Sequence, residues 1–273
     1  MSVSDKDGAL FKYQLVDASH QSYDMRCHLH DKTELIYVTS GKLQLRLDQT
    51  VITLCAGELC YISGGVLHGG VGTDCVFETL VFDALSVLGQ NSSLREYIAK
   101  IESAFSSGNC RFIGQSAALR IFSAAKNQKG AFELNVISAL CDFYAGIPEL
   151  YENQDAVYDK NSLWQVKTAV TYIEANYKES ITLEQIAHVA KLSPKYFCRY
   201  FKSVTNRTPI DYLNLYRIET ACKLLDEGFS VSETADECGF SDASYFVRAF
   251  KKYKGVTPKQ YALKKEGHCA YIY

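Results

Sequence analysis

The sequence lacks the features of a secreted or membrane-inserted chain. Its first residues, MSVSDKDGAL, do not combine a basic start with a following apolar stretch, and no uninterrupted apolar run approaches the roughly 20 residues needed to cross a bilayer. The ten cysteines contain no C-x-x-C pair, and several stand inside apolar runs, as reduced and packed thiols do. We therefore expect a cytoplasmic protein with reduced cysteines and no membrane partner.

The chain also carries little net charge, −2, but this total hides an asymmetry between its halves. Residues 1–160 contain 13 Lys and Arg against 19 Asp and Glu, a net of −6, whereas residues 161–273 contain 16 against 12, a net of +4. A length of 273 residues with 47% hydrophobic residues indicates about two globular domains. An acidic domain followed by a basic one favours a polyanion as the partner of the second.

The hydrophobic pattern changes period along the chain. In KLQLRL, Leu43, Leu45 and Leu47 share one face of a strand, and TSGK, LDQT and CAGE supply turns, so residues 1–90 are predicted to form a small antiparallel β-barrel or β-sandwich. Helical spacing follows over 91–150, a polar stretch without period indicates a linker at 151–162, and residues 163–266 are predicted to be all-α. The expected fold class is a multidomain α+β protein.

One short unit occurs twice in the helical half, first as KLSPKYFCRYFKSVTNRTPIDY and then as GFSDASYFVRAFKKYKGVTPKQY. Before each copy, a capping box (Thr182 with Gln185, Ser230 with Glu233) opens a short helix that a tight turn closes. Each following helix is predicted to begin at a serine N-cap, Ser193 or Ser241. The repeat therefore predicts two helix-turn-helix units, separated by the segment from Pro209 to Asp226.

The second helix of each unit has a paired-phenylalanine face and a basic face. Phe197 and Phe201, like Phe246 and Phe250, are four residues apart and must share the buried side, so the opposite side is free to touch a partner. Arginine can read guanine, small apolar groups can meet thymine methyls, and lysine can neutralise phosphates; the alternative is a merely solvated charged face. The predicted DNA-binding residues are Lys195, Cys198, Arg199, Lys202, Ala243, Ser244, Val247, Arg248, Lys251 and Lys252.

The segment from about Val166 to Leu263 resembles the AraC/XylS family of bacterial transcription regulators. RIETACKLL, Arg217 to Leu225, is similar to the connecting-helix signature of that family, and the second copy of the repeat resembles its C-terminal signature nearly throughout. The resemblance implies that two recognition helices enter successive major-groove segments of double-stranded promoter DNA. It also implies a ligand-binding domain of the cupin type, a homodimer formed through the helices of residues 91–150, and RNA polymerase as a further partner.

The first domain carries two spaced motifs that resemble those of cupins. HLHDKTELIYVTSG places His28, His30, Glu34 and Gly41 at H-x-H-x3-E-x6-G, and GELCYISGGVLHGGVG adds His68 at a second spacing. Alternate residues of a strand face the same way, so these side chains can meet inside the barrel. Three imidazoles and one carboxylate suit Zn, Mn, Fe, Co or Ni, and the same four residues can instead bind an effector by hydrogen bonds alone.

Three functions compete at this point. The duplicated DNA-binding module favours a transcription regulator whose cupin-like domain senses a small-molecule effector, for which the many aromatic residues are compatible with a sugar. The alternative is a metal-dependent cupin enzyme, such as a dioxygenase or isomerase, with an accessory helical domain. A redox sensor using cysteine is the third; Cys27 stands beside His28, but buried structural thiols are the default for such a pattern.

Overall fold

A computed structural model describes residues 9–105, 111–113, 116–127, 130–151 and 163–267. The chain divides into two compact units between Ser162 and Leu163, and each is described here by itself. Of the predicted linker, only residue 151, the last of a helix, lies within the described residues.

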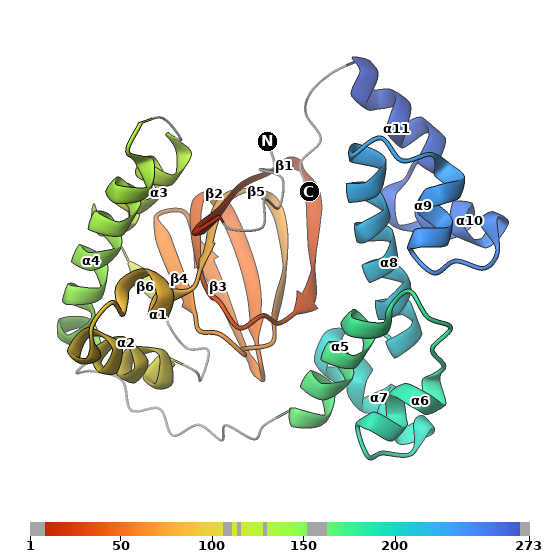
Figure 1. The fold of residues 1–273 in the computed structure, drawn as a ribbon, viewed down its shortest axis with the longest axis horizontal. Coiled ribbons are helices and arrows are strands. Elements are labelled where there is room, and N and C mark those ends of the chain that lie inside the picture. Colours follow the sequence, from red (N-terminus) through yellow and green to blue (C-terminus); the bar gives the residue numbers. More distant parts are fainter. Residues whose placement is uncertain (1–8, 106–110, 114–115, 128–129, 152–162, 268–273) are drawn as a thin grey trace. The chain divides into compact units, whose positions relative to one another are not determined.

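The first unit is built on an antiparallel sheet that curls into a cupin-like barrel (Figure 1). Within the described residues its strands run in the order β1-β5-β2-β4-β6, and β3 pairs with β2. The strands are β1 Phe11–His28, β2 Thr33–Leu47, β3 Thr50–Cys55, β4 Glu58–Ile62, β5 His68–Phe82 and β6 Arg111–Ile113. The predicted α+β class is confirmed, but the three-residue strand β6 lies in the region predicted to be helical, because its pairing with β4 is non-local and leaves no period in the sequence.

Strand β2 is buried on both faces along its first half, so its residues alternate between two separate cores. Ile36 and Val38 point into the barrel core, together with the leucines of the KLQLRL strand. Leu35 and Tyr37 point the other way, into the outer core beneath the helices. Glu34 and Thr33 follow the same alternation and therefore lie on opposite sides of the same strand.

Helices cover the outer face of this sheet. They are α1 Ala84–Leu88, α2 Ser92–Phe105, α3 Ser116–Lys126 and α4 Phe132–Tyr151. Their apolar stripes, with Ile98, Phe122 and Phe143 among the buried side chains, complete the outer core against β2, β4 and β5. The helices therefore separate the barrel from solvent on one side.

The second unit is all-α within the described residues and is centred on one long helix (Figure 1). Its helices are α5 Trp164–Asn176, α6 Leu183–Val189, α7 Pro194–Thr205, α8 Pro209–Asp226, α9 Val231–Glu237, α10 Ala243–Lys254 and α11 Pro258–Gly267. The connecting helix α8 has the predicted bounds and buries an almost continuous series of side chains. It is thus the core element against which both helix-turn-helix units pack.

The local signals of the two helix-turn-helix units are largely confirmed. Both capping boxes form, at Thr182 and at Ser230. The tight turns pass through left-handed backbone, with φ of 54° at Lys191 and 74° at Gly239. One prediction is wrong: α10 begins after Asp242, whose carboxylate accepts a hydrogen bond from the Ser244 amide, and not at Ser241. The residue inserted in the second copy moves the cap by one position.

Arg217 of α8 contacts both helix-turn-helix units. Its guanidinium donates to the carbonyl oxygens of Tyr177 and Glu179, each at 2.7 Å, beside the first helix-turn-helix unit. It also lies 5.4 Å from the ring centroid of Phe240 in the second helix-turn-helix unit. Gly239 packs so closely that a Cβ there would lie 2.4 Å from the Lys178 carbonyl oxygen, which excludes any side chain. The two helix-turn-helix units therefore pack closely against each other next to α8.

Candidate DNA interface and effector site

The recognition helices α7 and α10 each bury one face and expose the other. Phe197 and Phe201 of α7, and Phe246 and Phe250 of α10, are fully buried. The opposite faces carry the predicted contact residues: Lys195, Arg199, Lys202, Ala243, Ser244, Arg248, Lys251 and Lys252 are exposed, whereas Cys198 and Val247 are half-buried. Each unit thus presents arginine and lysine on the surface of its second helix, where DNA could reach them.

Two of these side chains have protein partners that the sequence pattern did not predict. The Arg248 guanidinium lies 3.9 Å from the Asp242 carboxylate and 6.0 Å from the centre of the Tyr245 ring. Lys252 Nζ donates to Oδ1 of Asp211 on α8 at 2.7 Å. The two carboxylates, Asp242 and Asp211, lie outside the basic face, so helical periodicity alone could not predict these contacts.

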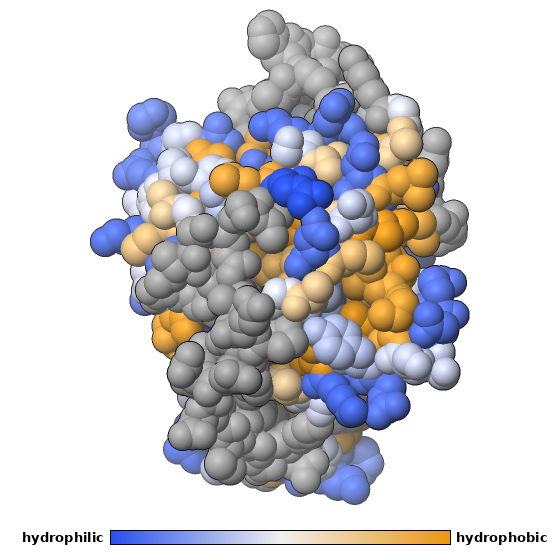
Figure 2. Space-filling view, turned by 90° about the vertical axis from the view of Figure 1, so that its left-hand side faces the viewer, coloured by the Kyte–Doolittle hydropathy of each residue, from blue (hydrophilic) through white to orange (hydrophobic). Residues whose placement is uncertain are grey.

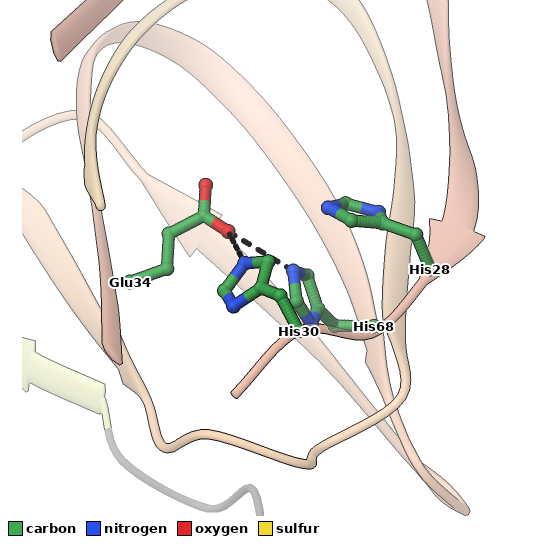
Figure 3. Close-up of side chains that lie close together, drawn as sticks. All are labelled: His28, His30, Glu34 and His68. Carbon is green, nitrogen blue, oxygen red and sulfur yellow. Dashed lines mark hydrogen bonds and ion pairs between the residues drawn. The ribbon is translucent and has the colours of Figure 1, made fainter. Parts of the chain in front are cut away.

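In the N-terminal domain of the chain, the four predicted cupin residues converge at one end of the barrel (Figure 3). His28 ends β1, His30 follows in the connecting turn, Glu34 lies on β2 and His68 begins β5. One ligand atom from each of the four lies within 4.8 Å of the others. The Nε2 atoms of His30 and His68 lie 3.2 and 3.0 Å from the same oxygen of Glu34, Oε2.

All three imidazoles are oriented in the same way by the main chain. The Nδ1 atoms of His28, His30 and His68 lie 2.9, 2.8 and 2.8 Å from the carbonyl oxygens of Arg26, Lys32 and Val66. A carbonyl oxygen only accepts, so each Nδ1 carries the proton and donates it. In a neutral ring the Nε2 atom then has a free lone pair, which is the arrangement that orients histidine in metal centres.

The cluster is electrostatically unusual because a carboxylate is buried in it. Burial by itself would raise the pKa of Glu34, but the nearby imidazoles of His30 and His68 hold that pKa well below its usual range. Burial and the nearby His68 keep the pKa of His28 well below its usual value. Burial by itself would lower the pKa of His30, but its contact with Glu34 raises that pKa overall. Glu34 is therefore an anion that needs a cation or a proton on the facing nitrogens.

This donor set fits a divalent transition metal. If His30 and His68 are neutral, their Nε2 lone pairs face a carboxylate oxygen, and two acceptors at about 3 Å repel each other unless a cation or proton lies between them. Three imidazole nitrogens and one carboxylate oxygen are ligands that Zn, Mn, Fe, Co and Ni accept. His28, His30, Glu34 and His68 are the residues that would hold such an ion.

Comparison with known proteins supports both halves of this description. A family model for a helix-turn-helix domain matches residues 186–264, and a model for a cupin domain matches residues 18–77. The HTH-type transcriptional regulator YdeC of Bacillus subtilis is 27% identical over 248 residues, which cover 86% of this chain and 84% of that protein. YdiP of Escherichia coli, also an HTH-type transcriptional regulator, is 24% identical over 263 residues, covering 86% and 80%.

A solved structure has the same two-part fold. The structure of ToxT from Vibrio cholerae superposes with a TM-score of 0.55 at 13% identity and covers 93% of this chain and 98% of that one. A cupin domain and a double helix-turn-helix domain thus occur together in one chain, in the order that the sequence resemblance implied. The chain belongs to the AraC family of transcriptional regulators.

Membership of the AraC family confirms that the chain is a DNA-binding regulator and not a cupin enzyme. Its helix-turn-helix domain binds double-stranded DNA, and its cupin-like domain is the ligand-binding half. None of the helices that the structure describes is both long and apolar enough to span a membrane.

Among the eight cysteines that lie within the described residues, five are buried: Cys27, Cys60, Cys75, Cys222 and Cys238. Burial raises the pKa of the Cys27 thiol to about 11 and also raises that of Cys60, which is fully buried. A thiolate is the reactive form of cysteine, so both side chains are held in the unreactive form at neutral pH. These two cysteines therefore behave as packing residues and do not favour the redox-sensor interpretation.

Two structural groups next to the cluster were missed by the sequence analysis. Buried Asp48 accepts a hydrogen bond from the Leu67 amide at 3.0 Å and donates its own amide to the Leu67 oxygen at 2.7 Å, which positions the residue before His68. Glu102 of α2 accepts a hydrogen bond from Thr33 at 2.7 Å and others from Tyr61 and Tyr144. Their members come from distant segments, so no local motif could have indicated them.

Proposed function

We propose that this regulator responds to a small-molecule effector that binds at the cluster of His28, His30, Glu34 and His68, and that the cluster holds a divalent transition metal. The supporting observation is the common orientation of the three imidazoles toward one buried carboxylate. When bound, the metal would supply positive charge and an open coordination position for an oxygen or nitrogen of the effector. The protein acts in the cytosol, where it meets promoter DNA.

The DNA-binding half of the proposal assigns sequence reading to α7 and α10. Both helices belong to one compact unit and expose an arginine on the side opposite their buried phenylalanines. Recognition helices of paired units enter major-groove segments about one helical turn, or roughly 34 Å, apart. Arg199 and Arg248 would then contact bases, and Lys195, Lys202 and Lys251 would contact phosphates.

We also propose that two copies of the chain associate through α3 and α4. Figure 2 views the molecule from the side where these helices lie and shows apolar side chains gathered among charged ones. Leu119 of α3 and Leu134 of α4 are 57% and 67% exposed. Leu134→Glu should shift the protein from dimer to monomer in sedimentation, whereas Leu263→Glu, at a 54% exposed leucine of α11, should not. A monomeric wild-type protein would refute this part.

Metal content is the direct test of the cluster. Full-length protein purified without chelators should contain about one transition metal ion per chain by elemental analysis, and Glu34→Gln and His68→Ala should lose it. His20→Asn is the matched control, because His20 is exposed, outside the cluster and at a φ of 69° that asparagine tolerates. A wild-type protein without bound metal after incubation with Zn, Mn, Fe, Co or Ni salts would refute the metal site.

The effector is tested through DNA binding of the full chain. A panel of sugars tests the class suggested by the aromatic composition, and an unsaturated fatty acid tests the class bound in a ToxT structure that matches here at 11% identity and a TM-score of 0.52. A true effector should change the affinity for promoter DNA in the wild type and in His20→Asn but not in Glu34→Gln. A response that persists in Glu34→Gln would place effector binding elsewhere.

A further inference from the structure

Asp211, on the first turn of α8, contacts both helix-turn-helix units. Its Oδ1 atom accepts hydrogen bonds from Lys252 Nζ at 2.7 Å and from the Tyr253 hydroxyl at 2.6 Å, both on α10. Its Oδ2 atom accepts one from Arg207, in the turn that joins α7 to α8, at 3.3 Å. The Tyr253 hydroxyl also lies 3.2 Å from the Asp211 carbonyl oxygen. One carboxylate therefore joins the end of the first unit to the recognition helix of the second.

The internal repeat shows that this role is specific to Asp211. The equivalent position in the second copy is Gln260, because Tyr212 aligns with Tyr261. The Gln260 side chain turns back to its own helix start, where its oxygen accepts from the amide and hydroxyl of Thr257 at 3.0 and 3.1 Å. The Asp211 carboxylate instead accepts hydrogen bonds from Lys252 and Tyr253 of α10, as well as from Arg207. A helix-capping position in one copy is therefore an inter-unit contact in the other.

The partners on α10 also have no counterpart in the first copy. Lys252 aligns with Ser203, whose hydroxyl donates to the Tyr200 carbonyl oxygen of its own helix at 2.7 Å. Tyr253 aligns with Val204, which is buried in the first unit. Duplication alone would have left both positions equivalent, so the contact between α10 and α8 is an addition to the repeat and not part of the shared helix-turn-helix fold.

We propose that Asp211, with Lys252 and Tyr253, is a positioning residue that sets the orientation of α10 relative to α7 and so the spacing of the two DNA segments that the protein reads. The apolar face of α10 packs through Phe246 and Phe250, and apolar contacts are non-directional. Charge-assisted hydrogen bonds have a preferred direction and length, so they can select one rotation of the helix among those that apolar packing allows.

The charges of this contact persist at neutral pH. Burial alone would raise the pKa of Asp211, but the hydrogen bonds from Lys252 and Tyr253 lower it overall. The bond to Asp211 raises the pKa of Lys252, and burial together with Asp211 raises the pKa of Tyr253 to about 12. The Lys252 side chain remains 64% exposed, so the contact is partly solvated and its contribution is modest.

The test uses full-length protein and a duplex selected by the wild type from a random library. Further duplexes carry one or two base pairs inserted between the two protected segments, or one segment alone. Asp211→Ala and Lys252→Ala should each weaken binding to the selected duplex about threefold to tenfold, tolerate the inserted base pairs better than the wild type, and leave single-segment affinity unchanged. The double variant should lose no more than either single variant, because both remove one interaction.

Lys251→Ala is the matched control, since Lys251 is the exposed neighbour of Lys252 on the same helix. It should flatten the salt dependence of binding, whereas Lys252→Ala should not. Asp211→Asn changes the carboxylate with little change in shape, and thermal melting of all variants shows whether each is folded. Together they exclude misfolding as the cause of a loss of DNA binding. Equal salt effects of the two lysine changes, with no effect of Asp211→Ala, would identify Lys252 as a phosphate contact and overturn the proposal.

The proposal rests on the reading of DNA by both helices, and the duplex series separates the two ideas. A wild-type protein that binds one segment as tightly as two would overturn two-segment reading, and the positioning role with it. A wild type that needs both segments at one spacing, with variants that behave identically to it, would overturn the positioning role alone.

Discussion

Replacement of Arg199 or Arg248 by alanine is the sharpest test of whether the exposed faces of α7 and α10, called here the reading face, contact DNA bases. A bidentate arginine–guanine contact contributes about 1–3 kcal/mol of discrimination, so Arg199→Ala should weaken binding to the specific site by about 5-fold to 150-fold. Arg248 begins from a different state, because it lies 3.9 Å from Asp242 with both side chains more than half exposed. Contact with a base has to exchange this exposed ion pair, which is worth about 0–1 kcal/mol. Arg248→Ala should therefore cost up to about 1 kcal/mol less than Arg199→Ala.

The assay compares duplexes that differ by single base pairs, at two salt concentrations. Arg199→Ala should relax the sequence preference in one segment of the site and Arg248→Ala in a segment about one helical turn away. Lys251→Ala should instead weaken all duplexes nearly equally and reduce the salt slope by about one unit. If both arginine changes leave the sequence preference intact and lower affinity for specific and random DNA alike, these residues contact phosphates and the reading face is assigned wrongly.

Three further predictions concern folding, packing and thiol chemistry. Residues 163–267 expressed alone should bind the selected duplex with a steep salt dependence, because they form a compact unit. A folded fragment that does not distinguish this duplex from random DNA would contradict sequence-specific binding by this unit. Glu102→Ala should lower the free energy of unfolding in urea by about 2–4 kcal/mol, since Thr33, Tyr61 and Tyr144 lose their shared acceptor. Glu96→Ala, in an exposed pair with Lys100 on the same helix, should leave the free energy of unfolding nearly unchanged, and equal losses for the two variants would deny Glu102 its role. Iodoacetamide at pH 8 should modify the partly exposed Cys198 of α7 well before Cys27, whose pKa is raised to about 11. Early labelling of Cys27 would reopen the redox-sensor interpretation.

Much of the DNA-binding unit could be predicted because its signals are local. A capping box links residues three positions apart, and paired phenylalanines four positions apart define a buried helix face without knowledge of the fold. The bounds of α8, both capping boxes and the buried sides of α7 and α10 follow from such short-range rules. The misplaced cap at Ser241 shows their limit, since an adjacent Asp242 competes for the same role.

The four residues of the cupin site could be identified from the sequence, because strand alternation and motif spacing depend only on the period of the backbone. The arrangement of these residues depends on the folded chain: carbonyl oxygens orient each imidazole, and both His30 and His68 face one oxygen of Glu34. Tertiary structure likewise turned Lys252 from the basic face toward Asp211, 41 residues away in the chain. Periodicity specifies the side of a helix or strand on which a residue lies, but the partner it meets there depends on packing between segments that are distant in sequence.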